Sequence, residues 1–443
     1  MTKVKDENSA RHITFSLIKF CLPLILSGIL QQLYSWADAF IVGNAEGDLA
    51  LAAIGATSSV INLFVNTVTG FALGLSVLFA QNYGRRALSE IPRLLSTFMI
   101  FLGSIFLALS VAGVLLAAPF LSALQTPSDI FDAALGYLRI IFVGLPFLTI
   151  YNVISAALRG IGDSKTPFYA VLLSSGVNIA LDIYFVAVLK AGVCGAAIAT
   201  VISQVAMAVF IVIYSFAKHK LLRPERGGHL FYKKSFADGC RFSLPPMIQS
   251  SVSSFGNIIL QGFMNGFGSP TVTAITTAYR IDSIIMIPIT NLGSGISTQV
   301  AQRYGAGEKR RGTRIFKIGT ILTAAVSVIL TLAVIPTGGY LISLFGAGET
   351  AVKIGEAFFL RIACFYVVFG LFTAIRSYLE GIGDVLYSGL AGIASLISRI
   401  VASYAWKGIF GNMVIAYAEI FSWIFLLLLY IFRLVAKRKE MRE

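Results

Sequence analysis

Long apolar segments separated by short polar connections are the feature that most restricts the fold of this 443-residue chain. A helix that crosses the hydrocarbon core of a membrane needs about 20 predominantly apolar residues. Only 13% of the residues are charged, whereas a water-soluble protein carries roughly 25%. The runs are continuous, whereas a membrane β-barrel needs short alternating segments. We therefore predict an all-α polytopic membrane protein with twelve spans, at about 15–41, 50–80, 94–118, 133–158, 167–189, 191–217, 242–265, 272–302, 313–344, 355–378, 386–406 and 409–432.

The positions of the positive charges predict the orientation of these spans. Of the 35 Lys and Arg residues, 27 lie in the two terminal segments and the even-numbered connections, and the odd-numbered connections hold only Lys190, Lys353 and Lys407. Cytoplasmic loops carry an excess of Lys and Arg. We therefore expect a multi-pass protein of the bacterial cytoplasmic membrane with both termini in the cytoplasm. The net charge of +14 is explained by topology, and we expect no nucleic-acid partner.

The chain contains an internal repeat. "GLSVLFAQNYG" at 74–84 aligns with "GISTQVAQRYG" at 295–305, and "LRGIGD" at 158–163 aligns with "LEGIGD" at 379–384, both at an offset of 221. "FCLP" at 20–23 and "FSLP" at 242–245 match at 222. Six spans in each half give the halves one orientation, as parallel repeats related by an axis along the membrane normal. We predict a lobe at 1–217, a cytoplasmic linker at 218–241 and a lobe at 242–443.

Motifs of catalysis are missing from the sequence. The dipeptide Gly-Lys of an ATP-binding loop never occurs, and neither a His-Glu-x-x-His motif nor a G-x-S-x-G elbow is present. The four cysteines are scattered without a C-x-x-C pair, which disfavours disulfides and a zinc site. We expect a protein that is not an enzyme and that needs no cofactor other than a coupling ion.

Two aspartates lie inside the spans of the first half, Asp38 in span 1 and Asp182 in span 5. Ionisable groups within a membrane are costly and usually functional. Counted from the outer ends of their spans, Asp38, Asp182 and Thr200 of span 6 share a depth of roughly 8–14 Å at 1.5 Å per residue.

Polar residues at helical spacing accompany these three. Side chains three, four or seven residues apart share one face of a helix. The polar sets are Gln31, Tyr34 and Asp38; Asn178 and Asp182; and Thr200 and Gln204. Three helices are thus predicted to turn polar stripes toward one cavity.

The halves differ in their supply of counter-ions. Within its spans the first half has only Arg139, which suffices for one aspartate at most. The second half has four arginines and three acids, and we predict structural ion pairs between Arg376 and Glu380 and between Arg399 and Glu419. Arg280 and Asp282 are two residues apart and cannot face each other. Asp38 and Asp182 therefore need a cation from outside: either a shared proton or Na⁺ held by carboxylate, amide and hydroxyl oxygens. The sequence does not choose between H⁺ and Na⁺.

These motifs resemble the MATE (multidrug and toxic compound extrusion) family, and more narrowly its prokaryotic DinF-like branch. The resemblance rests on the two six-span lobes, the basic linker, "AQNYG" and "AQRYG", "LRGIGDSKTP" and "GVCGAAIATVISQ". It implies cation coupling at Asp38, Asn178, Asp182 and Thr200, and a helix-bending role for Pro23. We expect Gln31, Tyr34, Asn152 and Gln204 to line the cavity. One departure is the absence of an acid from "SLPPMIQSSVSSFGN" in span 7, where the sodium-binding branch has a glutamate.

We expect a secondary multidrug efflux antiporter that exports amphipathic organic cations in exchange for H⁺ or Na⁺. We expect it to be a monomer in the lipid bilayer. The two lobes would provide alternating access. One alternative is a flippase for lipid-linked oligosaccharides or peptidoglycan precursors, which would use the second-half arginines to hold pyrophosphate. Another is a membrane scaffold or sensor that transports nothing.

Overall fold

The computed structural model describes residues 9–223 and 229–437, and within these ranges every regular element is a helix. Contacts divide the chain into two compact units. The N-terminal unit is Leu26–Met247, and the C-terminal unit is Ile248–Glu443 together with the residues as far as Ile25. The predicted lobes were 1–217 and 242–443, with a linker at 218–241. In the structure the first part of span 1 belongs instead to the C-terminal unit, and the first part of span 7 belongs to the N-terminal unit.

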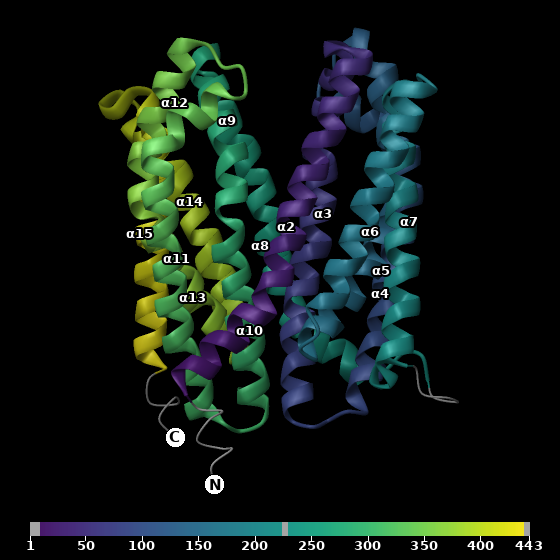
Figure 1. Ribbon diagram of the computed structural model, residues 1–443, viewed down its shortest axis with the longest axis vertical. Helices are drawn as coiled ribbons and strands as arrows, with labels where there is room; N and C mark the ends of the chain where they lie inside the picture. The colour runs from purple at the N-terminus through teal and green to yellow at the C-terminus, as the bar shows by residue number, and fades with distance from the viewer. Residues whose placement is uncertain (1–8, 224–228, 438–443) are drawn as a thin grey trace. The chain divides into compact units, whose positions relative to one another are not determined.

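The N-terminal unit contains most of the first six long helices. Its α5 packs against α3, α4 and α7, and α6 packs against α7; Figure 1 shows α4, α5, α6 and α7 running side by side. The elements are α2 (Ala10–Glu46), α3 (Asp48–Gly84), α4 (Glu90–Ala123), α5 (Ser128–Gly160), α6 (Lys165–Asp182), the π-helical η1 (Ile183–Val188), α7 (Gly192–Lys218) and the 3-10 turn η2 (Lys220–Leu222).

The C-terminal unit has the corresponding set with more interruptions. Here α10 packs against α11 and α13, and α14 packs against α15. The elements are α8 (Lys233–Asn265), α9 (Ser269–Ile285), α10 (Ile287–Gly305), α11 (Lys309–Ser343), α12 (Glu349–Ile362), η3 (Ala363–Phe365), α13 (Tyr366–Gly381), α14 (Val385–Phe410), η4 (Gly411–Met413) and α15 (Val414–Ala436).

The helices reproduce the twelve predicted spans. In the described ranges nine segments are long and apolar enough to cross a membrane, and the pair α9 and α10, bent by 41° ahead of Pro288, makes a tenth. One of the nine, Val385–Ala436, has 52 residues, or about 78 Å of helix, and it consists of two packed helices, α14 and α15. The twelfth is α8, whose 33 residues include many serines and amides. The all-α membrane fold is thus confirmed.

Glycines let two helix starts pack closely within their units. A Cβ atom on Gly74 of α3 would overlap the backbone of Phe242 and Ser243 in α8. At the repeat-related position, a Cβ atom on Gly295 of α10 would overlap the Cys21 sulfur in α2. The start of α8 therefore packs in the N-terminal unit and the start of α2 in the C-terminal unit, in agreement with the unit bounds.

Candidate functional site

The two aspartates of the first half belong to neighbouring parts of the N-terminal unit. Asp38 lies in α2 and is partly buried, and Asp182 is the last residue of α6 and has no exposed surface. The two carboxylates are close enough to interact electrostatically. Asn178 lies one turn before Asp182 on α6 and is 1% exposed.

These buried polar groups have no hydrogen-bond partners among the described residues. The atoms concerned are both oxygens of Asp182, Oδ1 of Asp38, and both amide atoms of Asn178. Buried polar atoms are almost always hydrogen-bonded, and an unpaired charge in a dry interior is very unfavourable. The three carboxylate oxygens thus need a proton or a cation.

The donor set suits a proton or a hard cation better than a transition metal. Among the described residues no group of three or more His, Cys, Asp or Glu side chains is placed to hold a metal ion. Sodium would have to be held by two carboxylates and neutral oxygens, which are the ligands that hard cations prefer.

Tyr137 of α5 is a site residue that the sequence analysis did not identify. It is 6% exposed and lies within electrostatic reach of Asp38, Tyr34 and Asp182. It packs in an apolar cluster with Val42 of α2 and Val186 of η1. Val42 and Val186 each lie one turn after an aspartate, at Asp38 and Asp182. A single tyrosine in an apolar run gave no signal in the sequence, because Tyr is common in membrane helices.

The backbone changes from α-helix to π-helix immediately after Asp182, at Ile183–Val188. Such segments are rare and frequently occur at functional sites. Here the wider turn shifts the residues after Asp182 relative to a regular helix, and Val186 reaches the apolar cluster beside Tyr137.

The other predicted site residues occupy varied surroundings. Asn152 donates to the Leu148 carbonyl of its own helix at 2.9 Å. Gln204 of α7 places Oε1 against Gly144 of α5, without a hydrogen-bond donor in the described part of the chain. Thr200 is partly buried and Gln31 is exposed. Pro23 lies within α2, in the part that belongs to the C-terminal unit.

Within the described ranges no arginine forms an ion pair with the two aspartates. Arg139 is exposed and makes no ion pair with the residues that the structure describes. In the C-terminal unit, by contrast, Arg376 Nε lies 2.7 Å from Glu380 Oε1, and Arg399 Nη2 lies 2.8 Å from Glu419 Oε2.

The third acid of the second half, Asp282, is bound by a tyrosine. The Tyr366 hydroxyl donates a hydrogen bond to Asp282 Oδ1 at 2.6 Å. Its neighbour Arg280 is exposed. The reason is helical geometry, since residues two apart point in different directions.

The comparison with protein families decides the identity. The MatE family model matches residues 23–184 and 245–405, which are the two halves of the internal repeat. The chain belongs to the MatE family. It is therefore a MATE family transporter rather than an enzyme, as its motifs predicted.

Individual MatE relatives cover nearly the whole chain. It is 26% identical over 450 residues to the probable multidrug resistance protein YoeA of Bacillus subtilis, covering 99% of this chain and 97% of that one. It is 29% identical over 398 residues to the probable multidrug resistance protein YpnP of the same organism, covering 89% and 87%.

Solved structures show the same fold. A multidrug resistance MATE family transporter in an outward-facing conformation aligns with a TM-score of 0.86 at 20% identity, covering 96% of this chain and 95% of that one. A MATE in the bent conformation aligns with a TM-score of 0.88 at 20% identity, covering 97% of each chain. MATE structures have twelve helices in two lobes, in agreement with the helices described above.

Proposed function

We propose that this MATE transporter is a multidrug efflux antiporter of the cytoplasmic membrane, which exports amphipathic organic cations in exchange for H⁺ or Na⁺ by alternating access. The observation that carries the proposal is the set of unpartnered oxygens on Asp38 and Asp182. A mobile cation would satisfy these oxygens, and Asn178, one turn before Asp182 on α6, offers a neutral oxygen. Coupling follows if the ion and an organic cation exclude each other from the same acidic groups, because each ligand then favours a different state.

The arrangement of the arginines disfavours the flippase alternative. A pyrophosphate site needs several guanidinium groups without carboxylates beside them, because a carboxylate repels the anion. Arg376 lies beside Glu380 and Arg399 beside Glu419. Arg361 donates to the Ala357 carbonyl at 2.6 Å. A membrane scaffold or sensor that transports nothing would not explain why two buried aspartates lack partners.

The test is efflux of ethidium, an organic cation, from proteoliposomes under H⁺ and Na⁺ gradients imposed separately. We expect one gradient to drive efflux by the wild type and to lose its effect in Asp38→Asn and Asp182→Asn. Asp132→Asn, which changes an exposed carboxylate of α5, is the matched control and retains efflux. Full gradient-driven efflux in both site variants would contradict the coupling role, and no ethidium flux by the wild type would contradict transport of this class of substrate.

A further inference from the structure

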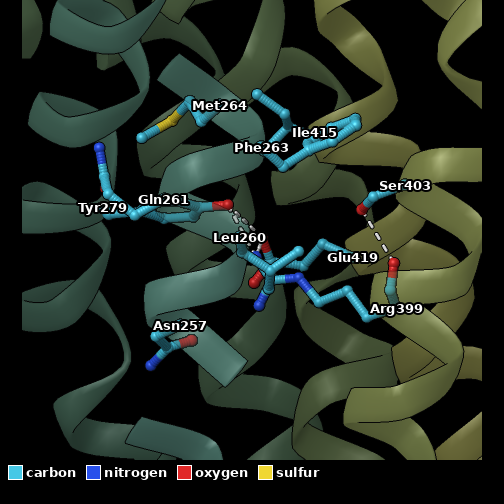
Figure 2. Close-up of a pocket in the computed structure, with 10 residues that line it drawn as sticks. All are labelled: Asn257, Leu260, Gln261, Phe263, Met264, Tyr279, Arg399, Ser403, Ile415 and Glu419. Atoms are coloured by element: carbon cyan, nitrogen blue, oxygen red, sulfur yellow. Dashed lines mark hydrogen bonds and ion pairs between the residues drawn. The ribbon is translucent and has the colours of Figure 1, made fainter. Parts of the chain in front are cut away.

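A pocket of about 320 Å³ lies entirely within the C-terminal unit. Figure 2 shows Tyr279, Arg399 and Glu419 converging in it, with Asn257 and Gln261 of α8 alongside. Its volume is at the lower end of the range for small-molecule sites.

The internal repeat relates this pocket to the aspartate site. At the offset of 221, Arg399 corresponds to Asn178 and Ser403 to Asp182; at the offset of 222 that applies to α2 and α8, Leu260 corresponds to Asp38. Arg399, Ser403 and Leu260 all line the pocket. The aspartate site and the pocket therefore use equivalent positions of the duplicated fold. In the C-terminal unit these positions hold Leu260 and Ser403 instead of the two aspartates, and Arg399 instead of the asparagine.

The charged groups in the pocket keep free hydrogen-bonding capacity. Arg399 Nη2 donates to the Tyr279 hydroxyl at 2.7 Å and to Glu419 Oε2 at 2.8 Å. Within the described ranges its other N–H groups have no acceptor, and Glu419 Oε1 has no donor. The remaining Arg399 nitrogens and Glu419 Oε1 are not fully buried. One positive and one negative group therefore remain available to a ligand.

The pocket is also lined by apolar side chains, which indicate the kind of ligand that it can hold. Leu260, Phe263, Met264 and Ile415 face the same space. Phe263 also packs edge-on against Tyr404, with ring centroids 4.8 Å apart. A flat apolar or aromatic group suits these side chains, as in most small-molecule sites.

We propose that this pocket is a second ligand site, which binds a small aromatic zwitterion. A ligand with only a cation is attracted by Glu419 and repelled by Arg399, and a ligand with only an anion meets the reverse. A zwitterion gains from both groups and preserves the neutrality of the pair. The site does not depend on ion coupling at Asp38 and Asp182.

Three probes with one indole body separate these cases. Tryptophan is a zwitterion, tryptamine lacks the carboxylate, and indole-3-propionate lacks the ammonium group. Calorimetric titration of the purified full chain measures their binding without any ion gradient. We expect tryptophan to bind at least about tenfold more tightly than either single-charge probe, since it adds a charge-assisted hydrogen bond. Equal binding of the three probes, or no saturable binding of tryptophan, would overturn the proposal.

A pair of double variants locates the binding. Arg399→Gln with Glu419→Gln removes both charges, and we expect it to lower tryptophan affinity to that of the single-charge probes. Arg376→Gln with Glu380→Gln removes a second ion pair of the same unit outside the pocket, and it retains the affinity. Thermal unfolding midpoints monitor folding, and the probe series on the wild type stands without any variant. Unchanged binding in the first variant, or equal loss in both, would overturn the assignment.

Discussion

At the scale of single residues, the proposed site depends on the buried oxygens of Asp38 and Asp182, which have no hydrogen-bond partner within the described ranges. Asp38 and Asp182 are conspicuous because a carboxylate in an apolar run is expensive. Helical spacing also put Asn178 on the face of Asp182. Tyr137 could not be found in this way, because its role depends on how α5 packs beside α2 and α6. The Tyr366 partner of Asp282 is likewise a tertiary contact without a sequence signal.

Asp163, in the connection after α5, forms hydrogen bonds with the start of α6 and with the end of α7. Its carboxylate accepts hydrogen bonds from the Thr166 hydroxyl, from Lys218 Nζ at 2.9 Å and from His219 Nε2 at 2.7 Å. Burial alone would raise the pKa of Asp163, but these hydrogen bonds outweigh it and hold the pKa well below its usual range. The ionised form therefore stabilises the folded chain.

The pH dependence of that stabilisation has a definite sign. Because the pKa is lower in the folded chain, the contribution is complete above the unfolded value of about 3.9 and is lost as pH falls further. We expect Asp163→Asn to lower the thermal unfolding midpoint at pH 7, and the gap from the wild type to narrow below about pH 4. A gap that is constant with pH would show that the carboxylate charge is not responsible.

At the scale of helices, apolar run length predicted where the spans lie but not how they are interrupted. The bend between α9 and α10, the 3-10 turn at Ala363–Phe365 and the π segment after Asp182 all fall inside predicted spans. Pro288 gave a local signal for the first. The other two contain no proline or glycine, so they depend on packing against neighbouring helices. The role of Pro23 in bending α2 stays a prediction.

Close packing of helices predicts opposite effects on stability when two glycines of α3 are replaced by alanine. Gly74 contacts the backbone of α8, whereas Gly55 of the same helix faces open space. We expect Gly74→Ala to destabilise the protein by about 1–3 kcal/mol through overpacking. Gly55→Ala should stabilise it by about 0.5–1 kcal/mol, because alanine favours the helix. Thermal unfolding in detergent compares the two, and equal shifts would contradict the close contact.

At the scale of the whole molecule, three short motifs at nearly one offset predicted the duplication. Those motifs predicted an organisation in two halves, and the family match covers a segment of each half. The exact membership of each unit was not predictable, since the first residues of α2 belong with the C-terminal unit and the first residues of α8 with the N-terminal one. That exchange depends on contacts such as Gly74 with Phe242, which join residues far apart in the chain.

The central claim is that Asp38 and Asp182 hold a cation that an organic substrate displaces. The most direct measurement is release of H⁺, by an indicator dye in weak buffer, or of bound ²²Na⁺ when ethidium is added to the purified protein. We predict release from the wild type and none from the protein that carries both Asp38→Asn and Asp182→Asn. Release of as many ions from the double variant as from the wild type would contradict the account.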